Sequence, residues 1–157
     1  IKNLGRSGDT TDQLNDRFET DVLPFAPKVL IIMAGVNDFR GNIIGWHTVS
    51  NYKEIAEKCK ANDIIPVFMT PTPVNPVLIK KAAFIDQPPP DWKTHYKYAC
   101  NWIKQQEYHI DITAEFEDYE GNLRYDLTTD GLHPDFEGKK IIGRAVNEWF
   151  NKNKLLK

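Results

Sequence analysis

The sequence has little of several features that would assign it to a class of protein at once. Its two cysteines, Cys59 and Cys100, lie inside predicted helices, are too few for a disulfide framework and lack a metal-binding spacing, so we expect buried free thiols. No apolar run approaches the roughly 20 residues of a membrane-spanning helix. With 20 basic and 22 acidic residues the net charge is -2. This balance disfavours binding to nucleic acid or an anionic membrane and favours a small or neutral partner.

Serine is also scarce. The chain contains Ser7 and Ser50 and no other serine. Neither of them sits on a recognisable nucleophile turn, in which a serine follows a strand and opens a helix. The residues therefore do not offer an evident serine nucleophile of their own.

The length of 157 residues predicts one domain, 1–157, because nothing in the composition demands a second. Helical and strand patterns alternate, which is typical of an α/β fold with a parallel sheet. Thr10 and Gln13 predict a capping box at the start of a helix that ends near Pro24. We expect strands near 1–4, 29–33, 64–69 and 108–112, and further helices over 52–59, 91–106 and a C-terminal apolar stripe from Ile141 to Phe150.

The stretch from Thr70 to Pro90 holds six of the ten prolines. Because proline cannot donate to a helix or a central strand, this stretch predicts an irregular excursion over the surface rather than a domain linker. Such loops often shape substrate pockets.

Three groups of residues fall on loops that follow expected strands, where open parallel sheets bind ligands. Gly8 can expose its N–H near a helix start, although a tight turn explains it equally well. Asn37 can donate its amide to an oxyanion, although a turn or capping role is favoured when it is taken alone. Asp130 lies three residues before His133 and can orient its imidazole as a general base, and a helix-capping loop closed by Pro134 is the alternative.

Taken together, these residues resemble the SGNH hydrolases, also called GDSL esterases and lipases. Gly8 in Ser-Gly-Asp-Thr resembles the family's oxyanion glycine, and Asn37 in Gly-Val-Asn-Asp resembles its oxyanion asparagine. Asp130 and His133 in Asp-Gly-Leu-His-Pro resemble its catalytic pair. The resemblance runs from Asn3 to the C-terminal helix. The family's first block, Gly-Asp-Ser after an apolar strand, has no counterpart here.

The resemblance implies a three-layer flavodoxin-like parallel sheet with helices on both faces, of which the first strand and helix are missing from this sequence. It also implies a serine ester hydrolase that works through an acyl-enzyme and needs no cofactor or metal. We therefore expect the native protein to begin well before Ile1, with the nucleophilic serine upstream. The compartment stays open, with the cytoplasm slightly favoured over secretion.

The family includes carbohydrate acetylesterases, thioesterases and lysophospholipases, so the expected partner is a small-molecule ester. Short acyl chains are preferred, because no long exposed apolar segment suggests a lipid-facing lid. The main alternative is a noncatalytic SGNH-like binding protein, or an inactive fragment, that lacks the nucleophile. A second alternative is a metal-dependent phosphoesterase with Asp38, Asp130 and His133 as ligands.

Overall fold

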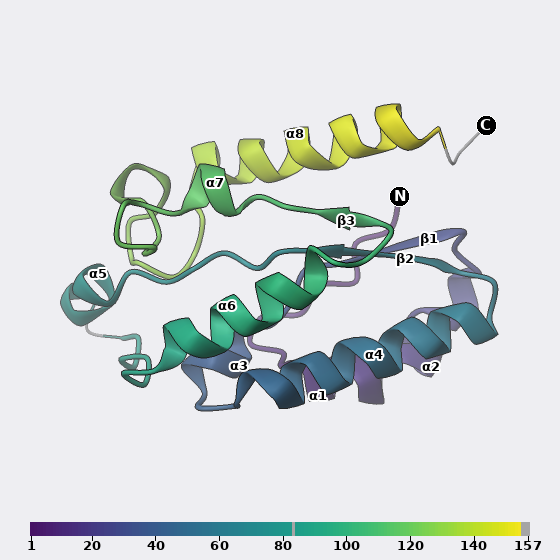
Figure 1. Cartoon of the computed structure of the whole chain (residues 1–157), viewed down its shortest axis with the longest axis horizontal. Helices are drawn as coiled ribbons and strands as arrows, with labels where there is room; N and C mark the ends of the chain where they lie inside the picture. Colours follow the sequence, from purple (N-terminus) through teal and green to yellow (C-terminus); the bar gives the residue numbers. More distant parts are fainter. Residues whose placement is uncertain (83, 155–157) are drawn as a thin grey trace.

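The computed structural model describes residues 1–82 and 84–154 and has three layers (Figure 1). The middle layer is a parallel sheet whose described strands are β1 (Val29–Ile32), β2 (Ile65–Met69) and β3 (His109–Ile110), in the order β1-β2-β3. Ile31 pairs with Val67, and Phe68 pairs with His109. The predicted α/β class with a parallel sheet is confirmed.

The helices cover both faces of this sheet. Helix α8 lies on one face in Figure 1, whereas α4 and α6 lie on the other, with α1 to α3 beside them. Short 3₁₀ helices follow α2 and precede α8 at η1 (Leu23–Phe25) and η2 (Tyr125–Leu127). The described α-helices are α1 (Thr11–Asp16), α2 (Phe18–Asp21), α3 (Val36–Arg40), α4 (Gly45–Ala61), α5 (Pro76–Lys81), α6 (Trp92–Ile103), α7 (Thr113–Phe116) and α8 (Phe136–Asn153).

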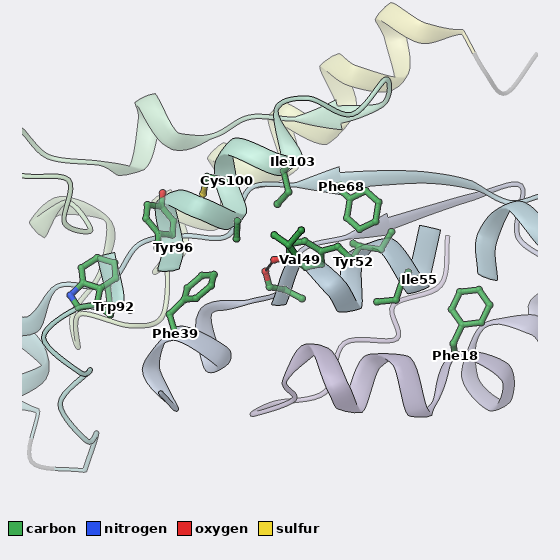
Figure 2. Close-up of a cluster of buried hydrophobic side chains, with 14 of the residues drawn as sticks. Phe18, Phe39, Val49, Tyr52, Ile55, Phe68, Trp92, Tyr96, Cys100 and Ile103 are labelled. Atoms are coloured by element: carbon green, nitrogen blue, oxygen red, sulfur yellow. Dashed lines mark hydrogen bonds between the residues drawn. The ribbon is translucent and has the colours of Figure 1, made fainter. Parts of the chain in front are cut away.

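The alternation of side chains along β2 builds two apolar cores, because successive residues of a strand point to opposite faces. Phe68 packs with Tyr52 of α4, whose ring centroid lies 5.5 Å away (Figure 2), and with Trp102 of α6, whose ring centroid lies 5.1 Å away. Val67 and Met69 point to the other face and join Trp149 of α8 in a second cluster. Cys59 and Cys100 are buried free thiols, as predicted.

The first predicted helix is divided. Thr10 caps α1 as expected, and its N–H donates to Gln13 Oε1 over 2.8 Å. The helix then breaks at Arg17, which lies between α1 and α2. Arg17 donates from Nη1 to the Leu4 carbonyl and to Asp21, at 2.9 and 3.0 Å. At this break the Arg17 guanidinium therefore connects Leu4, in the segment 1–6, to Asp21 of α2.

Part of the proline-rich prediction is wrong. Residues 70–75 are buried rather than exposed on the surface, and α5 follows them directly. Asn75 caps α5 by accepting the Leu78 N–H at 3.2 Å, and Pro76 occupies the first helical position, where a missing N–H costs nothing. The proline pattern signalled irregular backbone, but it carried no information about burial.

The strand expected near residues 1–4 does not form in the described structure. Instead, a groove of about 880 Å³ separates residues 1–6 from β1. Phe18 and Val22 line it from the helical layer below the sheet, and Val146 and Phe150 of α8 line it from above. Because paired strands must lie about 4.8 Å apart, a segment across this groove cannot join the sheet. We call this space the β1-edge groove.

Helix α8 shows the effect of this groove. Its predicted apolar stripe faces the sheet, yet among the stripe residues Trp149 alone is buried in the described structure. Val146 and Phe150 stay partly exposed because they line the β1-edge groove. No described helix combines the length and apolar character needed to cross a bilayer.

Candidate active site

The turn from Asp130 to His133 brings a carboxylate and an imidazole together. Asp130 Oδ2 lies 2.7 Å from His133 Nδ1. Its other oxygen, Oδ1, accepts the backbone N–H groups of Leu132 and His133, both at 2.8 Å. The carboxylate is thus fixed by its own turn, and its bond to Nδ1 leaves Nε2 as the ring nitrogen that can exchange a proton with a substrate.

The charge state of Asp130 follows from these contacts. Burial alone would raise its pKa, but the hydrogen bonds from the His133 ring and from the backbone N–H groups of His133 and Leu132 outweigh burial and lower the pKa to about 2. The carboxylate is therefore ionised at neutral pH. The His133 side chain is 65% exposed, so its ring is accessible to a ligand.

Gly131 allows the turn to lie close against the rest of the chain. It adopts a left-handed conformation with φ +83°, and a Cβ atom there would lie 2.5 Å from the Asn75 carbonyl oxygen. The Asn75 N–H donates to the Gly131 carbonyl over 2.7 Å. Thr128 closes the turn from the other side, where its hydroxyl donates to the His133 carbonyl and accepts the Gly131 N–H. Asn75 and Thr128 position the pair, and sequence reasoning missed both.

Asn37 lies in the first turn of α3 rather than in the polar loop predicted for it. Its Nδ2 donates to the Asp9 carbonyl over 2.9 Å. This bond uses one of the two amide protons and fixes the plane of the amide, so the second proton has a defined direction. Gly8 adopts φ +83°, and the space that a Cβ atom would occupy there is open to at least 4 Å. The bond to Asp9 therefore brings the loop containing Gly8 to Asn37.

The two halves of the candidate site lie at the same end of the sheet. Asn37 follows β1, and the Asp130 turn rests on the segment that follows β2 through the Asn75 contact. Figure 1 shows α3, α5 and the loop before α8 at this end. Among the described residues no hydrogen bond links His133 to Asn37 directly. Ser7 lies in an exposed turn and Ser50 on the exposed side of α4, and within the described structure neither is hydrogen-bonded to His133.

Over residues 1–82 and 84–154, no group of three or more His, Cys, Asp and Glu side chains gathers as metal ligands would. Asp38 is fully buried and faces threonine side chains. It therefore does not join Asp130 and His133 in the metal site considered as an alternative.

Comparison with known proteins decides the family. A family model described as the GDSL-like Lipase/Acylhydrolase family matches residues 1–141. The chain belongs to this family. The predicted relationship to the GDSL hydrolases is thus confirmed, and the parallel sheet with its helices is the fold shared with solved GDSL acylhydrolases.

Among solved structures, this GDSL-like chain is similar to a GDSL-like lipase from Bacteroides thetaiotaomicron, with 25% identity and a TM-score of 0.76 over 93% of this chain and 73% of that one. It is also similar to a catalytic mutant of the acetylxylan esterase Axe2 from Geobacillus stearothermophilus, with 22% identity and a TM-score of 0.70 over 91% and 68% of the two chains. The second likeness shows the fold alone.

Among curated proteins, the chain is 38% identical over 80 residues to the uncharacterized lipoprotein YqeF of Bacillus subtilis (strain 168). That alignment covers 47% of this chain and 33% of the lipoprotein. The chain therefore spans about a third of this curated relative.

The conformation of Gly131 predicts a specific sensitivity to substitution. Gly131→Ala should lower the free energy of unfolding by at least ~1–2 kcal/mol, because an L-residue is strained at positive φ and the new methyl group meets backbone atoms. Gly143→Ala is the matched control, since Gly143 lies inside α8 with nothing within 4 Å of the added Cβ, and it should stabilise by ~0.5–1 kcal/mol. Urea unfolding measures both, and equal effects of the two changes would contradict this account.

The low pKa of Asp130 predicts a pH dependence of stability. Between pH 3.8, the ordinary value, and about 2, the unfolded chain binds a proton that the folded chain does not. The hydrogen-bonded carboxylate therefore contributes stability that is fully present above this window and is lost as the pH falls through it. In urea unfolding, the free energy of unfolding of Asp130→Asn should therefore fall less between these two pH values than that of the wild type. If Asp130→Asn left the pH dependence of the free energy of unfolding unchanged, the turn would not hold the carboxylate in its ionised form.

Proposed function

We propose that this GDSL-like chain forms the base and oxyanion part of a serine ester hydrolase that works through an acyl-enzyme. In this proposal His133 is the general base and Asp130 orients it. The Gly8 N–H and the Asn37 amide are the oxyanion donors. The nucleophile is a serine outside these 157 residues. The observation that carries the proposal is the 2.7 Å contact between Asp130 Oδ2 and His133 Nδ1, within a turn built to hold it.

The first step of the proposed reaction is proton transfer from the serine hydroxyl to His133 Nε2 as the serine oxygen attacks the ester carbonyl. The ionised Asp130 stabilises the imidazolium that forms. The imidazolium then returns the proton to the leaving alcohol, and the acyl group stays on the serine. Water repeats the sequence and releases the acid.

The second requirement is stabilisation of the negative charge on the carbonyl oxygen. Asn37 supports this role because its bond to the Asp9 carbonyl orients the amide while leaving one N–H for a ligand. Gly8 supports it because its positive φ turns the backbone beside that amide. Donors fixed before the reaction need no reorganisation when the charge appears.

The β1-edge groove supports an external serine. It is bounded at one end by Asp9, Gly35 and Asn37, and apolar side chains line it from both helical layers. An apolar strand that paired with β1 in parallel would end beside Asn37, because the carboxyl ends of parallel strands meet at one edge of the sheet. A serine directly after such a strand would enter the site next to the oxyanion donors.

For the substrate we propose a short-chain ester. Within the described residues no long apolar helix or segment projects as a lipid-facing lid. The solved structures that share this fold include those of two acetylxylan esterases, AlAXEase and Axe2, and acetyl is the shortest of the common acyl groups. Both likenesses lie below 25% identity, so the acyl group and the alcohol are part of the proposal.

A fluorophosphonate, which labels activated serines, tests the proposed nucleophile in the natural protein that contains this chain. We expect one added label on a serine outside the 157 residues, located by peptide mass spectrometry. His133→Ala should abolish labelling, whereas His95→Ala should not, because His95 of α6 pairs with Asp91 rather than with Asp130. Absence of any label would favour the noncatalytic binding relative, and a label on Ser7 or Ser50 would contradict the external nucleophile.

Removal of an oxyanion donor gives a second test. Asn37→Ala should lower kcat on p-nitrophenyl acetate by about 100- to 1,000-fold, since one charge-stabilising hydrogen bond is lost in the transition state. Asn62→Ala, at the exposed end of α4, is the control and should keep its activity. A folded Asn37→Ala protein with full kcat would show that this amide is not an oxyanion donor.

A further inference from the structure

Asp38, the residue after Asn37, is a buried carboxylate held by neutral donors. Its exposure is 0%. It accepts hydrogen bonds from the Thr11 N–H at 3.0 Å, from the Thr11 hydroxyl, and from the Thr48 hydroxyl at 3.1 Å. Among the described residues it makes no salt bridge. The hydrogen bonds to this carboxyl group therefore come from uncharged donors.

Burial of the Asp38 carboxyl group costs free energy. A buried ionised group loses its hydration, and neutral donors replace only part of it. Burial accordingly raises the pKa of Asp38, although the hydrogen bonds from Thr11 and Thr48 oppose that rise. An apolar residue would fill the same space without this penalty. The hydrogen bonds around Asp38 show that the carboxyl group joins separate segments of the chain.

Two adjacent residues of α3 hold Asp9, in the loop before α1, and Thr11, the first residue of α1. Asn37 binds the Asp9 carbonyl, and Asp38 binds both the N–H and the hydroxyl of Thr11. Gly8 directly precedes this doubly held segment. The chain directly after Gly8 is therefore held to α3 at two points, Asp9 and Thr11.

Helix α4 completes the arrangement. Asn51 Nδ2 donates to the Thr11 hydroxyl over 2.9 Å, so this hydroxyl accepts one hydrogen bond and donates another to Asp38. Thr48, one turn earlier in α4, donates to the same oxygen of Asp38. The relay fixes the direction of the Thr11 hydroxyl and joins α1, α3 and α4 around one carboxylate.

We propose that Asp38 is a positioning residue that sets the distance between the two oxyanion donors, acting through Thr11. This inference rests on the proposed function. Asp38 does not touch the substrate. Its contribution appears in the transition state, because a donor displaced by a fraction of an ångström still permits substrate binding but stabilises the oxyanion less.

Asp38→Asn in the natural protein tests the proposal. The amide keeps one acceptor oxygen but turns an NH₂ group toward hydroxyl donors, so the Thr11 segment must shift. We expect kcat on p-nitrophenyl acetate to fall by about 10- to 100-fold with KM changed by less than about twofold, as for an interaction made only in the transition state. Asp16→Asn, an exposed aspartate at the other end of α1, is the control and should keep its kcat.

A matched pair of variants at Thr11 separates positioning from loss of structure. Thr11→Val has nearly the same shape but lacks the hydroxyl, and it should lower kcat in the way that Asp38→Asn does. Thr11→Ser restores the hydroxyl and should recover most of the activity. The double variant Asp38→Asn with Thr11→Val should be no slower than the slower single variant, because both changes break the same contact.

A tetrahedral boronic acid adduct supplies a readout that a merely structural defect would not move. Its affinity should fall in parallel with kcat in Asp38→Asn, at an unchanged fraction of active sites measured by fluorophosphonate titration. The inference is overturned if folded Asp38→Asn and Thr11→Val keep the wild-type kcat, or if the loss lies entirely in the active fraction. An inactive wild-type protein would instead overturn the proposed function, and this inference with it.

Discussion

The parallel pairing of β1 with β2 is the constraint on which the rest of the molecule depends. Parallel strands bring their carboxyl ends to one edge, so the segments that follow β1 and β2 must emerge side by side. One of these segments becomes α3 with Asn37, and the other contains Asn75, against which the Asp130 turn rests. Asn37 and Asp130, about 90 positions apart in the sequence, therefore lie at the same end of the sheet.

The loops at this end are held by polar contacts rather than by apolar packing. Asp38, Asn75 and Thr128 are all buried, and each makes two or more hydrogen bonds. Asp38 and Asn75 connect separate segments, whereas Thr128 closes the turn that holds Asp130 and His133. Such contacts fix direction as well as distance, whereas apolar contacts fix mainly distance. Fixed directions suit an acylhydrolase, because hydrogen-bond donors and bases act only when they point at the reacting atoms.

Much of the fold could be predicted from periodicity. The run from Val29 to Met33 and the helical spacing of Trp92, Tyr96, Ala99 and Ile103 gave β1 and α6 almost to their ends, because burial on fixed faces leaves a regular pattern. Asp130, His133, Gly8 and Asn37 could be proposed because their types and their places after strands suit one chemistry. The break at Arg17, the burial of residues 70–75 and the carboxylate of Asp38 could not be predicted. Each depends on contacts between distant segments, and a polar residue in a buried network looks like a surface residue in sequence.

The open side of β1 determines what this edge of the sheet can bind. Its backbone N–H and C=O groups on that side lack a strand partner in the described structure, and the groove beside them is lined with apolar side chains. An uncovered strand edge next to an apolar surface is a template for pairing with any extended chain, including the same segment of a neighbouring molecule. A segment that paired with this edge would therefore satisfy the backbone of β1 and cover the apolar side chains of the groove at the same time.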